Sequence, residues 1–212
     1  MKKRYLFPIS CLYCGNPTQF ALCPTCIEEW KKKHLNIRKH VSRTGEEIIS
    51  CCYYHSIGGN IIRGYKYGRR FDALPLISEA MHQALLEFRE EAFDWIIPVP
   101  QSWRKTLSRG FHPVELIGDQ LSKIIQTPLL SNVLRRRWVW SEKDQAGLDR
   151  SERLKNLSRT FYAAGKKEWE TKKKILLIDD VFTTGTTIFR CQSALKEKHP
   201  SWNVKILVFA HG

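Results

Sequence analysis

The sequence has no long apolar run, and this absence limits the classes of protein that it can encode. No stretch of the 212 residues approaches the roughly 18 uninterrupted apolar residues expected of a membrane span. The first ten residues hold three basic side chains and only a few apolar ones, too few for the hydrophobic region of a secretory signal. Internal repeats and low-complexity segments are also missing. We therefore expect a cytoplasmic protein without a transmembrane segment, whose contact with the inner membrane is at most peripheral.

Acidic residues are scarce relative to basic ones. The chain has 21 Asp and Glu against 35 Lys and Arg, which gives a formal charge of +14, and it contains seven Trp, seven Tyr and ten Phe. A basic, aromatic-rich composition indicates a polyanionic partner such as nucleic acid, although charge says nothing about the fold. The alternative is a solvated basic surface around a site for a small anionic substrate. The length suits one substantial α/β domain with a small appendage.

Four of the seven cysteines form two closely spaced pairs, Cys11-x2-Cys14 and Cys23-x2-Cys26. This spacing is typical of a tetrahedral Zn²⁺ site, since each pair forms a tight turn that presents two thiolates. A reducing cytoplasm disfavours disulfides, and the spacing is less typical of an iron–sulfur cluster. All four thiolates would be used by the metal, so we expect the zinc to be structural rather than catalytic.

The remaining elements follow from apolar patterns and from the positions of glycine and proline. The other three cysteines, Cys51, Cys52 and Cys191, are expected to be buried structural thiols. We expect basic helix 27–39, strand 46–55, a short helix and turn within 59–70, helix 73–91, strand 93–100, helix 113–127 and strand 203–210.

The most informative segment is 174–187, where a buried strand leads into a hydroxyl-rich turn. The apolar run Ile175–Ile178 predicts a central strand of a parallel sheet. Asp179 and Asp180 follow at its C-terminal end, where open α/β sheets bind their ligands. The segment Thr183–Thr187 then leads into a helix, and its hydroxyls and backbone N–H groups predict an anion site. Paired acids can accept hydrogen bonds from vicinal hydroxyls, so the whole segment suits a ribose 5-phosphate.

This segment resembles the signature of type I phosphoribosyltransferases, which bind phosphoribosyl pyrophosphate (PRPP) with two acids and a Thr/Gly phosphate loop. The alternative is a strand followed by an ordinary Thr-capped helix. Adjacent aspartates at a buried strand end make that alternative less attractive, because they repel each other unless a ligand lies near them.

A second strand, 93–100, leads into a basic segment, 101–112. We interpret this segment as a loop at the same edge of the sheet as Asp179, where Arg104, Lys105 and Arg109 are placed to bind a second anionic group such as pyrophosphate. The alternative is a solvent-exposed basic loop.

The stretch 134–161 is polar and dense in charge, and it combines cations with tryptophans. Three interpretations stay open: a surface for single-stranded nucleic acid, a flexible hood that closes over a reactive sugar, and a plain surface hairpin. The residues that we assign to nucleic acid are Arg135, Arg136, Arg137, Trp138, Trp140 and Arg153.

Taken together, the motifs resemble the ComF (ComFC) family of competence proteins along nearly the whole chain. The resemblance rests on the four-cysteine motif and on Tyr65-Lys66-Tyr67-Gly68, Pro98-Val99-Pro100, Arg109-Gly110-Phe111, Gln145, Leu148, Arg153, Asn156, Phe161 and Asp179 to Thr187. It differs at Glu142, where family members often have Thr, and Thr183 stands where some type I transferases carry an Asp that serves as the base.

The resemblance implies an α/β fold of the type I phosphoribosyltransferase kind, with a mostly parallel sheet flanked by helices and a small N-terminal four-cysteine zinc finger. Residues 1–40 would form the zinc-finger module with its basic linker helix, and residues 41–212 the phosphoribosyltransferase-like domain. The PRPP site would comprise Asp179, Asp180, Val181, Thr183, Thr184, Gly185, Thr186, Thr187, Arg104, Lys105 and Lys66. Asp179, Asp180, Arg109 and Lys105 would carry catalysis, with Mg²⁺ bound together with PRPP.

The resemblance also implies a role in natural transformation, in which the protein assists the entry or handling of single-stranded DNA. Its partners would be PRPP, single-stranded DNA and the DNA-uptake channel or helicase at the inner membrane face. One hypothesis is an enzyme that transfers phosphoribose to an unknown acceptor. The alternative is a non-catalytic DNA-binding protein that uses the pocket as a PRPP or nucleotide sensor.

Overall fold

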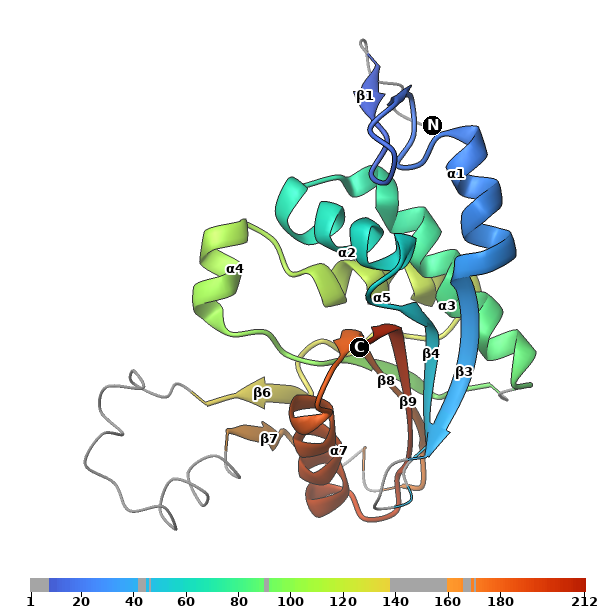
Figure 1. The fold of residues 1–212 in the computed structure, drawn as a ribbon. Coiled ribbons are helices and arrows are strands. Elements are labelled where there is room, and N and C mark those ends of the chain that lie inside the picture. The colour runs from blue at the N-terminus through green and yellow to red at the C-terminus, as the bar shows by residue number, and fades with distance from the viewer. Residues whose placement is uncertain are drawn as a thin grey trace.

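A five-stranded sheet forms the centre of the protein in the computed structural model, which describes residues 8–41, 45, 47–89, 92–137, 160–165, 169 and 171–212. The strand order is β3-β4-β9-β8-β5 (Figure 1). The strands are β3 (Leu35–Val41), β4 (Glu47–Tyr53), β5 (Trp95–Pro98), β8 (Lys174–Phe182) and β9 (Asn203–His211). Strands β4, β9, β8 and β5 pair in parallel, while β3 lies antiparallel to β4 at one edge. The predicted mostly parallel sheet is confirmed.

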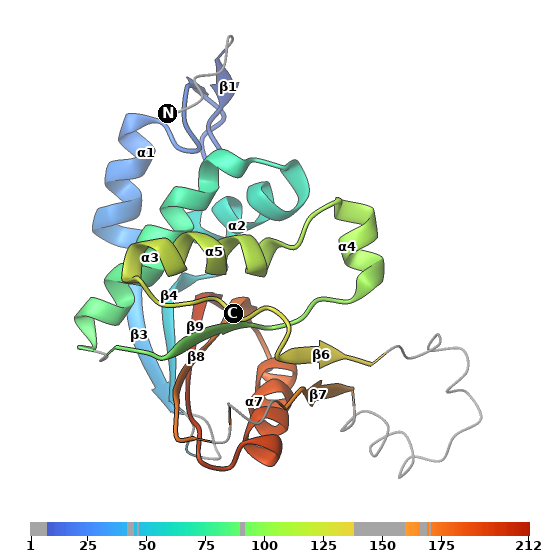
Figure 2. The same ribbon diagram turned by 180° about the vertical axis from the view of Figure 1, so that it is seen from behind.

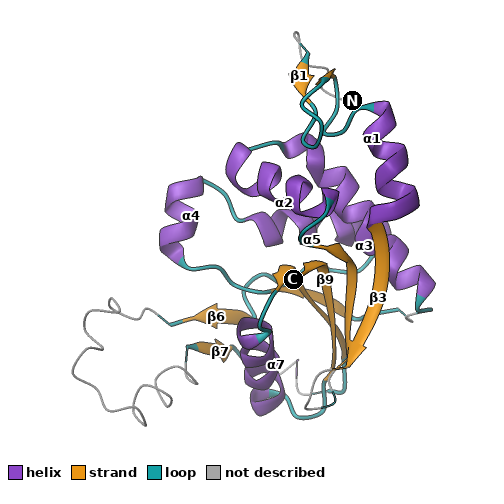
Figure 3. Ribbon diagram, in the orientation of Figure 1, coloured by secondary structure: helices purple, strands orange, loops and turns teal. Residues whose placement is uncertain are grey.

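Helices cover both faces of this sheet (Figure 3). One face packs against α2 (Ile57–Gly68), α3 (Leu74–Glu87) and α5 (Pro113–Ile125), which lie above the sheet in Figure 2. The other face packs against α7 (Thr186–Lys198) and the two short strands β6 (Leu134–Arg136) and β7 (Phe161–Ala163).

The apolar run of β8 explains why the sheet has two covered faces. Leu176 and Ile178 belong to the core on the α2, α3 and α5 side, whereas Ile175 and Leu177 belong to the core on the α7 side. Successive side chains of a strand point to opposite faces, so a strand that is apolar at every position must be covered twice. Each of these four side chains is 0% exposed.

The predicted basic helix 27–39 is wrong in its second half. Helix α1 (Pro24–Glu29) continues into a π-helical turn, Trp30–His34, and the chain then enters β3 at Leu35. Leu35 packs against the core, and Lys39 forms an ion pair with Glu47 of β4 at 2.9 Å. Cations are common on edge strands because they discourage pairing with another chain. Pairing with β4 therefore decides the structure of a segment whose composition suits a helix.

The predicted loop 101–112 also differs from the structure, because it contains helix α4 (Trp103–Arg109). Gly110 ends this helix in the left-handed conformation, with φ of 77° and a hydrogen bond from its N–H to the carbonyl of Thr106. No residue of α4 is buried, so the helix is held by its two ends and projects from the body of the protein (Figure 1).

Among the described residues, no helix has both the length and the apolar character that crossing a bilayer requires. Cys51, Cys52 and Cys191 are 0% exposed, which confirms their expected burial.

Candidate functional site

The two aspartates of the signature segment lie inside β8 rather than beyond its end, since the strand continues to Phe182. Asp180 is 5% exposed, and its Oδ2 lies 2.7 Å from Nζ of Lys66 on α2. Counted over the side chain alone, the exposed fraction is 14% for Lys66 and 8% for Asp180, so both partners of this ion pair are largely buried. The structure thus brings together two residues predicted for the same site from segments more than a hundred positions apart.

Asp179 occupies a position that opposes its ionisation. Its Oδ1 accepts a hydrogen bond from the backbone N–H of Asp180 at 2.8 Å. Burial, together with the neighbouring Asp180 carboxylate, raises the pKa of Asp179 well above its ordinary value, although Lys66 and Lys105 act in the opposite direction. A carboxyl group held in this way can form hydrogen bonds with the hydroxyls of a ligand. It can also lose its proton when a cation approaches.

This raised pKa predicts how Asp179→Asn should change stability. Between the ordinary pKa of 3.8 and the raised value, the folded chain holds a proton that the unfolded chain releases. Wild-type stability therefore falls as pH rises through that window and stays lowered above it. We expect the variant to melt higher than the wild type near neutral pH, by about 2–4 °C for each kcal/mol gained by removing a charge that is buried and repelled by Asp180, and the difference to vanish at more acidic pH.

Thermal melts of both proteins across pH, without ligand, measure this effect. Asp119→Asn is the matched control, because Asp119 is an exposed acid on α5 that pairs with Lys123 at 2.6 Å. A variant at Asp179 that melts no higher than the wild type at any pH would contradict the assignment.

The hydroxyl-rich turn follows β8 directly and ends in helix α7. Gly185 precedes the helix with φ of 73°, and a Cβ there would lie 2.5 Å from the ring of Phe189, so both the backbone angle and the space require glycine. The hydroxyls of Thr184 and Thr186 lie 3.0 Å apart. The backbone N–H groups that open a helix have no intrahelical partner, and here they lie beside exposed threonines. This arrangement can bind a phosphate.

The segment after β5 is held beside the aspartates by the sheet itself. The backbone N–H of Val99 donates to the carbonyl of Ile178 at 2.9 Å, so the chain leaves the sheet next to Asp179. Further on, the backbone N–H of Gln101 donates to Nε2 of His112 at 3.1 Å, which joins the start of the segment to its end. Helix α4 lies between these two anchors.

The cations of α2 and α4 line one pocket of about 450 Å³. Its lining residues are Lys66, Tyr67, Arg69, Lys105, Ser108 and Arg109. The guanidinium of Arg109 lies 4.7 Å from the ring centroid of Tyr67, a cation–π contact that orients it. Lys66 joins this pocket to Asp180 through its ion pair, and Lys105 acts electrostatically on Asp179. The pocket can therefore hold an anionic group next to the acid pair.

Not every predicted residue reaches this site. Arg104 is exposed and lies 5.6 Å from the ring centroid of Trp103, away from the residues that line the pocket. Arg135, Arg136 and Arg137 are exposed at the β6–β7 hairpin, where Arg136 lies over the ring of Phe161 and Arg137 over that of Tyr162. Trp138, Trp140, Glu142, Gln145, Leu148, Arg153 and Asn156 lie outside the described residues.

Two residues of the site were missed by sequence reasoning. The hydroxyl of buried Tyr65 donates to the carbonyl of Pro113 at 3.0 Å and so ties α2 to α5. Burial lowers the pKa of His112, although Glu115 and Asp180 oppose this shift. Since its Nε2 accepts from Gln101, the proton of the neutral ring lies on Nδ1, a buried atom without a hydrogen-bond partner among the described residues. The Tyr-Lys-Tyr-Gly motif was a signal for Tyr65, but no local pattern identifies His112.

The four N-terminal cysteines meet as predicted. Their Sγ atoms all lie within 4.8 Å of one another, and those of Cys14 and Cys23 are 3.6 Å apart. A tetrahedral zinc with Zn–S bonds of about 2.3 Å places its sulfurs about 3.8 Å apart, so this donor set fits the ion. The backbone N–H of Cys23 donates to Sγ of Cys11 at 3.4 Å, as expected around a thiolate ligand.

The protonation of these thiols is uneven. Burial opposes the ionisation of Cys11, but hydrogen bonds from the backbone, first of all that of Cys23, lower the pKa of its thiol to about 6. Burial and hydrogen bonds to the neighbouring thiols raise the pKa of Cys26 instead. The Cys11 sulfur is thus prepared to bind a metal as a thiolate, whereas the Cys26 thiol resists losing its proton.

The cysteine module packs on the helix that carries Lys66. Nδ2 of Asn60 donates to the carbonyl of Leu12 at 3.1 Å, and Arg70 donates to the carbonyl of Ser10 at 2.7 Å. A Cβ added at Gly64 of α2 would lie 2.4 Å from a methyl group of Leu12. The module therefore supports α2 from the side opposite the sheet (Figure 1).

Comparison with known proteins finds relatives among competence proteins. No protein-family model matches the chain. Competence protein F of Haemophilus influenzae is 23% identical over 193 residues, which cover 88% of this chain and 78% of that protein. Competence protein ComFC of Streptococcus pneumoniae is 30% identical over 133 residues, which cover 63% of this chain and about half, 54%, of that protein. The resemblance to ComF/ComFC competence proteins inferred from the motifs is confirmed.

Similar solved structures include phosphoribosyltransferases. Adenine phosphoribosyltransferase from Leishmania tarentolae matches with a TM-score of 0.47 and 9% identity, over 83% of this chain and 94% of that one. The glutamine PRPP amidotransferase from B. subtilis matches with a TM-score of 0.45 and 16% identity, over 68% of this chain and 30% of that one.

Proposed function

We propose that this chain, which is similar to the ComF/ComFC competence proteins along most of its length, binds PRPP with Mg²⁺ at the C-terminal edge of its sheet. The observation that supports this proposal most directly is the ion pair between Lys66 and Asp180. It connects the acid pair, which suits ribose hydroxyls, with a cationic pocket that suits pyrophosphate.

Three parts of the site match three parts of the ligand. Asp179 and Asp180 would accept hydrogen bonds from the two ribose hydroxyls, and the segment Thr183–Thr187 would bind the 5′-phosphate at the start of α7. Lys105 and Arg109 would bind the pyrophosphate in the pocket of about 450 Å³. Carboxylate oxygens are ligands that Mg²⁺ prefers, and the ion would offset charge on the pyrophosphate and the ribose oxygens.

Phosphoribosyl transfer follows from the same arrangement. The bond between C1 of the ribose and the pyrophosphate oxygen breaks, the pyrophosphate leaves with the electron pair, and an acceptor forms the new bond to C1. The cations of α4 stabilise the leaving group, while the carboxylates stabilise positive charge on the sugar. Thr183 stands where some transferases have a carboxylate base, so catalysis would depend mainly on positioning and electrostatics.

The relatives support a role in natural transformation, because both carry the name of competence proteins. In this role the chain would act in the cytoplasm on incoming single-stranded DNA, with which its charge of +14 is compatible. Its partners would include a component of the DNA-uptake machinery at the inner membrane.

Calorimetry with PRPP and Mg²⁺ tests the binding site. We expect saturable binding by the wild type and a loss of at least about 100-fold in affinity for the double variant Asp179→Asn, Asp180→Asn, because several hydrogen bonds to charged groups disappear together. Asp119→Asn is the control and should bind normally, since this acid lies on the exposed side of α5. Absence of PRPP binding by the wild type would refute the proposal.

Turnover is tested separately, by measuring pyrophosphate release with bases and oligonucleotides as acceptors. Release that depends on Asp179 supports the transferase. If no acceptor is used while PRPP alters the affinity for single-stranded DNA, the chain is instead a sensor that binds PRPP without chemistry.

A further inference from the structure

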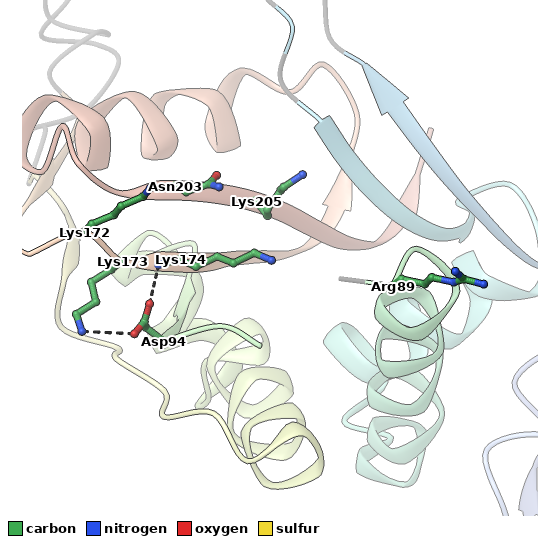
Figure 4. A pocket seen from close by; sticks show the side chains of 7 residues that line it. All are labelled: Arg89, Asp94, Lys172, Lys173, Lys174, Asn203 and Lys205. Carbon is green, nitrogen blue, oxygen red and sulfur yellow. Dashed lines mark hydrogen bonds and ion pairs between the residues drawn. The ribbon is translucent and has the colours of Figure 1, made fainter. Parts of the chain in front are cut away.

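A second cationic pocket lies at the other end of the same sheet, where β8 and β9 begin. It has a volume of about 560 Å³ and is lined by Arg89, Asp94, Lys172, Lys173, Lys174, Asn203 and Lys205. Figure 4 shows these side chains at the starts of β8 and β9 and at the end of α3. Five cations and one carboxylate therefore surround a single cavity. Such an excess of one charge in a concave site attracts anions.

The backbone framework of this pocket is fixed by Asp94. Its Oδ2 accepts a hydrogen bond from the backbone N–H of Lys174 at 2.7 Å, and its own N–H donates to the carbonyl of Lys174 at 2.9 Å. Nζ of Lys173 lies 3.4 Å from the Asp94 carboxylate. Asp94, the only acid among the described residues of the lining, is thus occupied by the strand that carries the lysines.

Two of the cations have no such partner. The side chains of Arg89 and Lys172 form no ion pair or hydrogen bond with any other residue that the structure describes, whereas Lys205 pairs with Glu47 of β4. Arg89 and Lys172 come from different elements, the end of α3 and the start of β8 (Figure 4). They are therefore available to bind a ligand from two sides.

The chemistry of the lining favours phosphate over a nucleobase. Among the described residues the lining contains no aromatic side chain, and two rings beside it are already covered: Nζ of Lys173 lies 5.1 Å from the ring centroid of Trp95, and Nζ of Lys174 lies 5.0 Å from that of Phe93. Recognition of a base needs an open ring for stacking. Ammonium and guanidinium groups with one amide suit the oxygens of phosphate groups instead.

This pocket is distinct from the proposed PRPP site. Lys174 begins β8 and Asp180 lies six positions later on the same strand. At about 3.3 Å per residue, the two sites are roughly 20 Å apart, at opposite ends of the strand. One ligand of the size of PRPP cannot occupy both.

We infer that the pocket between α3 and the starts of β8 and β9 binds linked phosphate groups. Two sources supply this chemistry, namely a free oligophosphate and the backbone of a nucleic-acid strand. The cavity of about 560 Å³ has room for linked phosphates, which Arg89 and Lys172 can bind from different elements of its lining.

The test compares a double variant, Arg89→Asn with Lys172→Ala, with a control that removes the same charge elsewhere. Asparagine tolerates the positive φ of 48° found at Arg89. The control is Lys32→Ala with Lys33→Ala, since both lysines are exposed on the π-helical turn before β3 and neither lines the pocket. The probes are inorganic tripolyphosphate, measured by calorimetry, and a short thymidine oligonucleotide, measured by fluorescence anisotropy over a range of salt concentrations.

We expect the pocket variant to lose at least about tenfold in affinity for one probe, and the control to stay within about twofold. Loss of tripolyphosphate binding assigns the pocket to free oligophosphates. Loss of oligonucleotide binding, with the slope of log affinity against log salt reduced by about 1.4, assigns it to a nucleic-acid backbone. The inference is overturned if neither probe binds the wild type, or if the pocket variant and the control lose affinity equally. PRPP binding should be unchanged in both variants, so the result does not depend on the first site.

Discussion

Replacing Lys66 with methionine should destabilise the folded chain by about 3 kcal/mol and abolish PRPP binding. The substitution leaves the Asp180 carboxylate, which is 8% exposed, without its partner at 2.7 Å. Breaking a buried ion pair by removing one partner typically costs about 3–5 kcal/mol, because the remaining charge is neither hydrated nor paired. Urea unfolding measures the stability, and calorimetry with PRPP measures the binding.

The double variant Lys66→Met with Asp180→Asn separates stability from function. It removes both charges, so we expect most of the stability to return while PRPP binding stays absent. Lys123→Met is the control for losing a surface ion pair, since Lys123 is 65% exposed, and it should change stability by less than about 1 kcal/mol. Additive losses in the double variant would show that Lys66 and Asp180 do not interact.

Removal of zinc should unfold the N-terminal module and, through it, weaken ligand binding at the proposed site. We expect one zinc per chain in reduced protein, and its loss by chelation should unfold the cysteine module. A segment this short depends on its metal, for which apparent binding energies of about 10–16 kcal/mol are typical. Because the module contacts α2 at Leu12 and Ser10, PRPP affinity should fall as well. Metal analysis and hydrogen exchange of residues 8–29 measure these changes.

Cys14→Ser is the sharpest variant for this prediction. Cys14 is exposed, so its replacement removes a zinc ligand with little change in packing. Cys191→Ala is the control: Cys191 is a buried residue of α7 outside the four-cysteine group, and its variant should keep the metal. A Cys14→Ser protein with a full complement of zinc, or a reduced wild type without any, would contradict the zinc assignment.

Local patterns predicted the parts of the site that lie within one segment. The apolar run Ile175–Ile178 indicated a strand buried on both faces, and the strand is buried in this way. The spacing of the cysteines indicated a cluster, and the sulfurs meet. In each case the residues are neighbours in sequence, so short-range geometry alone decides their arrangement.

Interpretations failed where a segment's structure depends on a distant partner. The stretch 27–39 has the composition of a basic helix, yet Leu35–Val41 forms a strand because β4 offers an unpaired edge. The segment 101–112 was expected to be a loop, and α4 forms there between anchors on Ile178 and His112. Tertiary contacts override modest local preferences in this way.

The sequence by itself determined which chemical groups this protein carries: two adjacent acids, a turn of hydroxyls, four closely spaced thiols and an excess of cations. The tertiary structure decided which of these groups act together. It paired Lys66 with Asp180, turned the lysines at the start of β8 away from the acids near its end, and left Arg104 outside the pocket. The physical reason is that side-chain type is a local property, whereas distance between charges depends on how parallel strands and their helices pack.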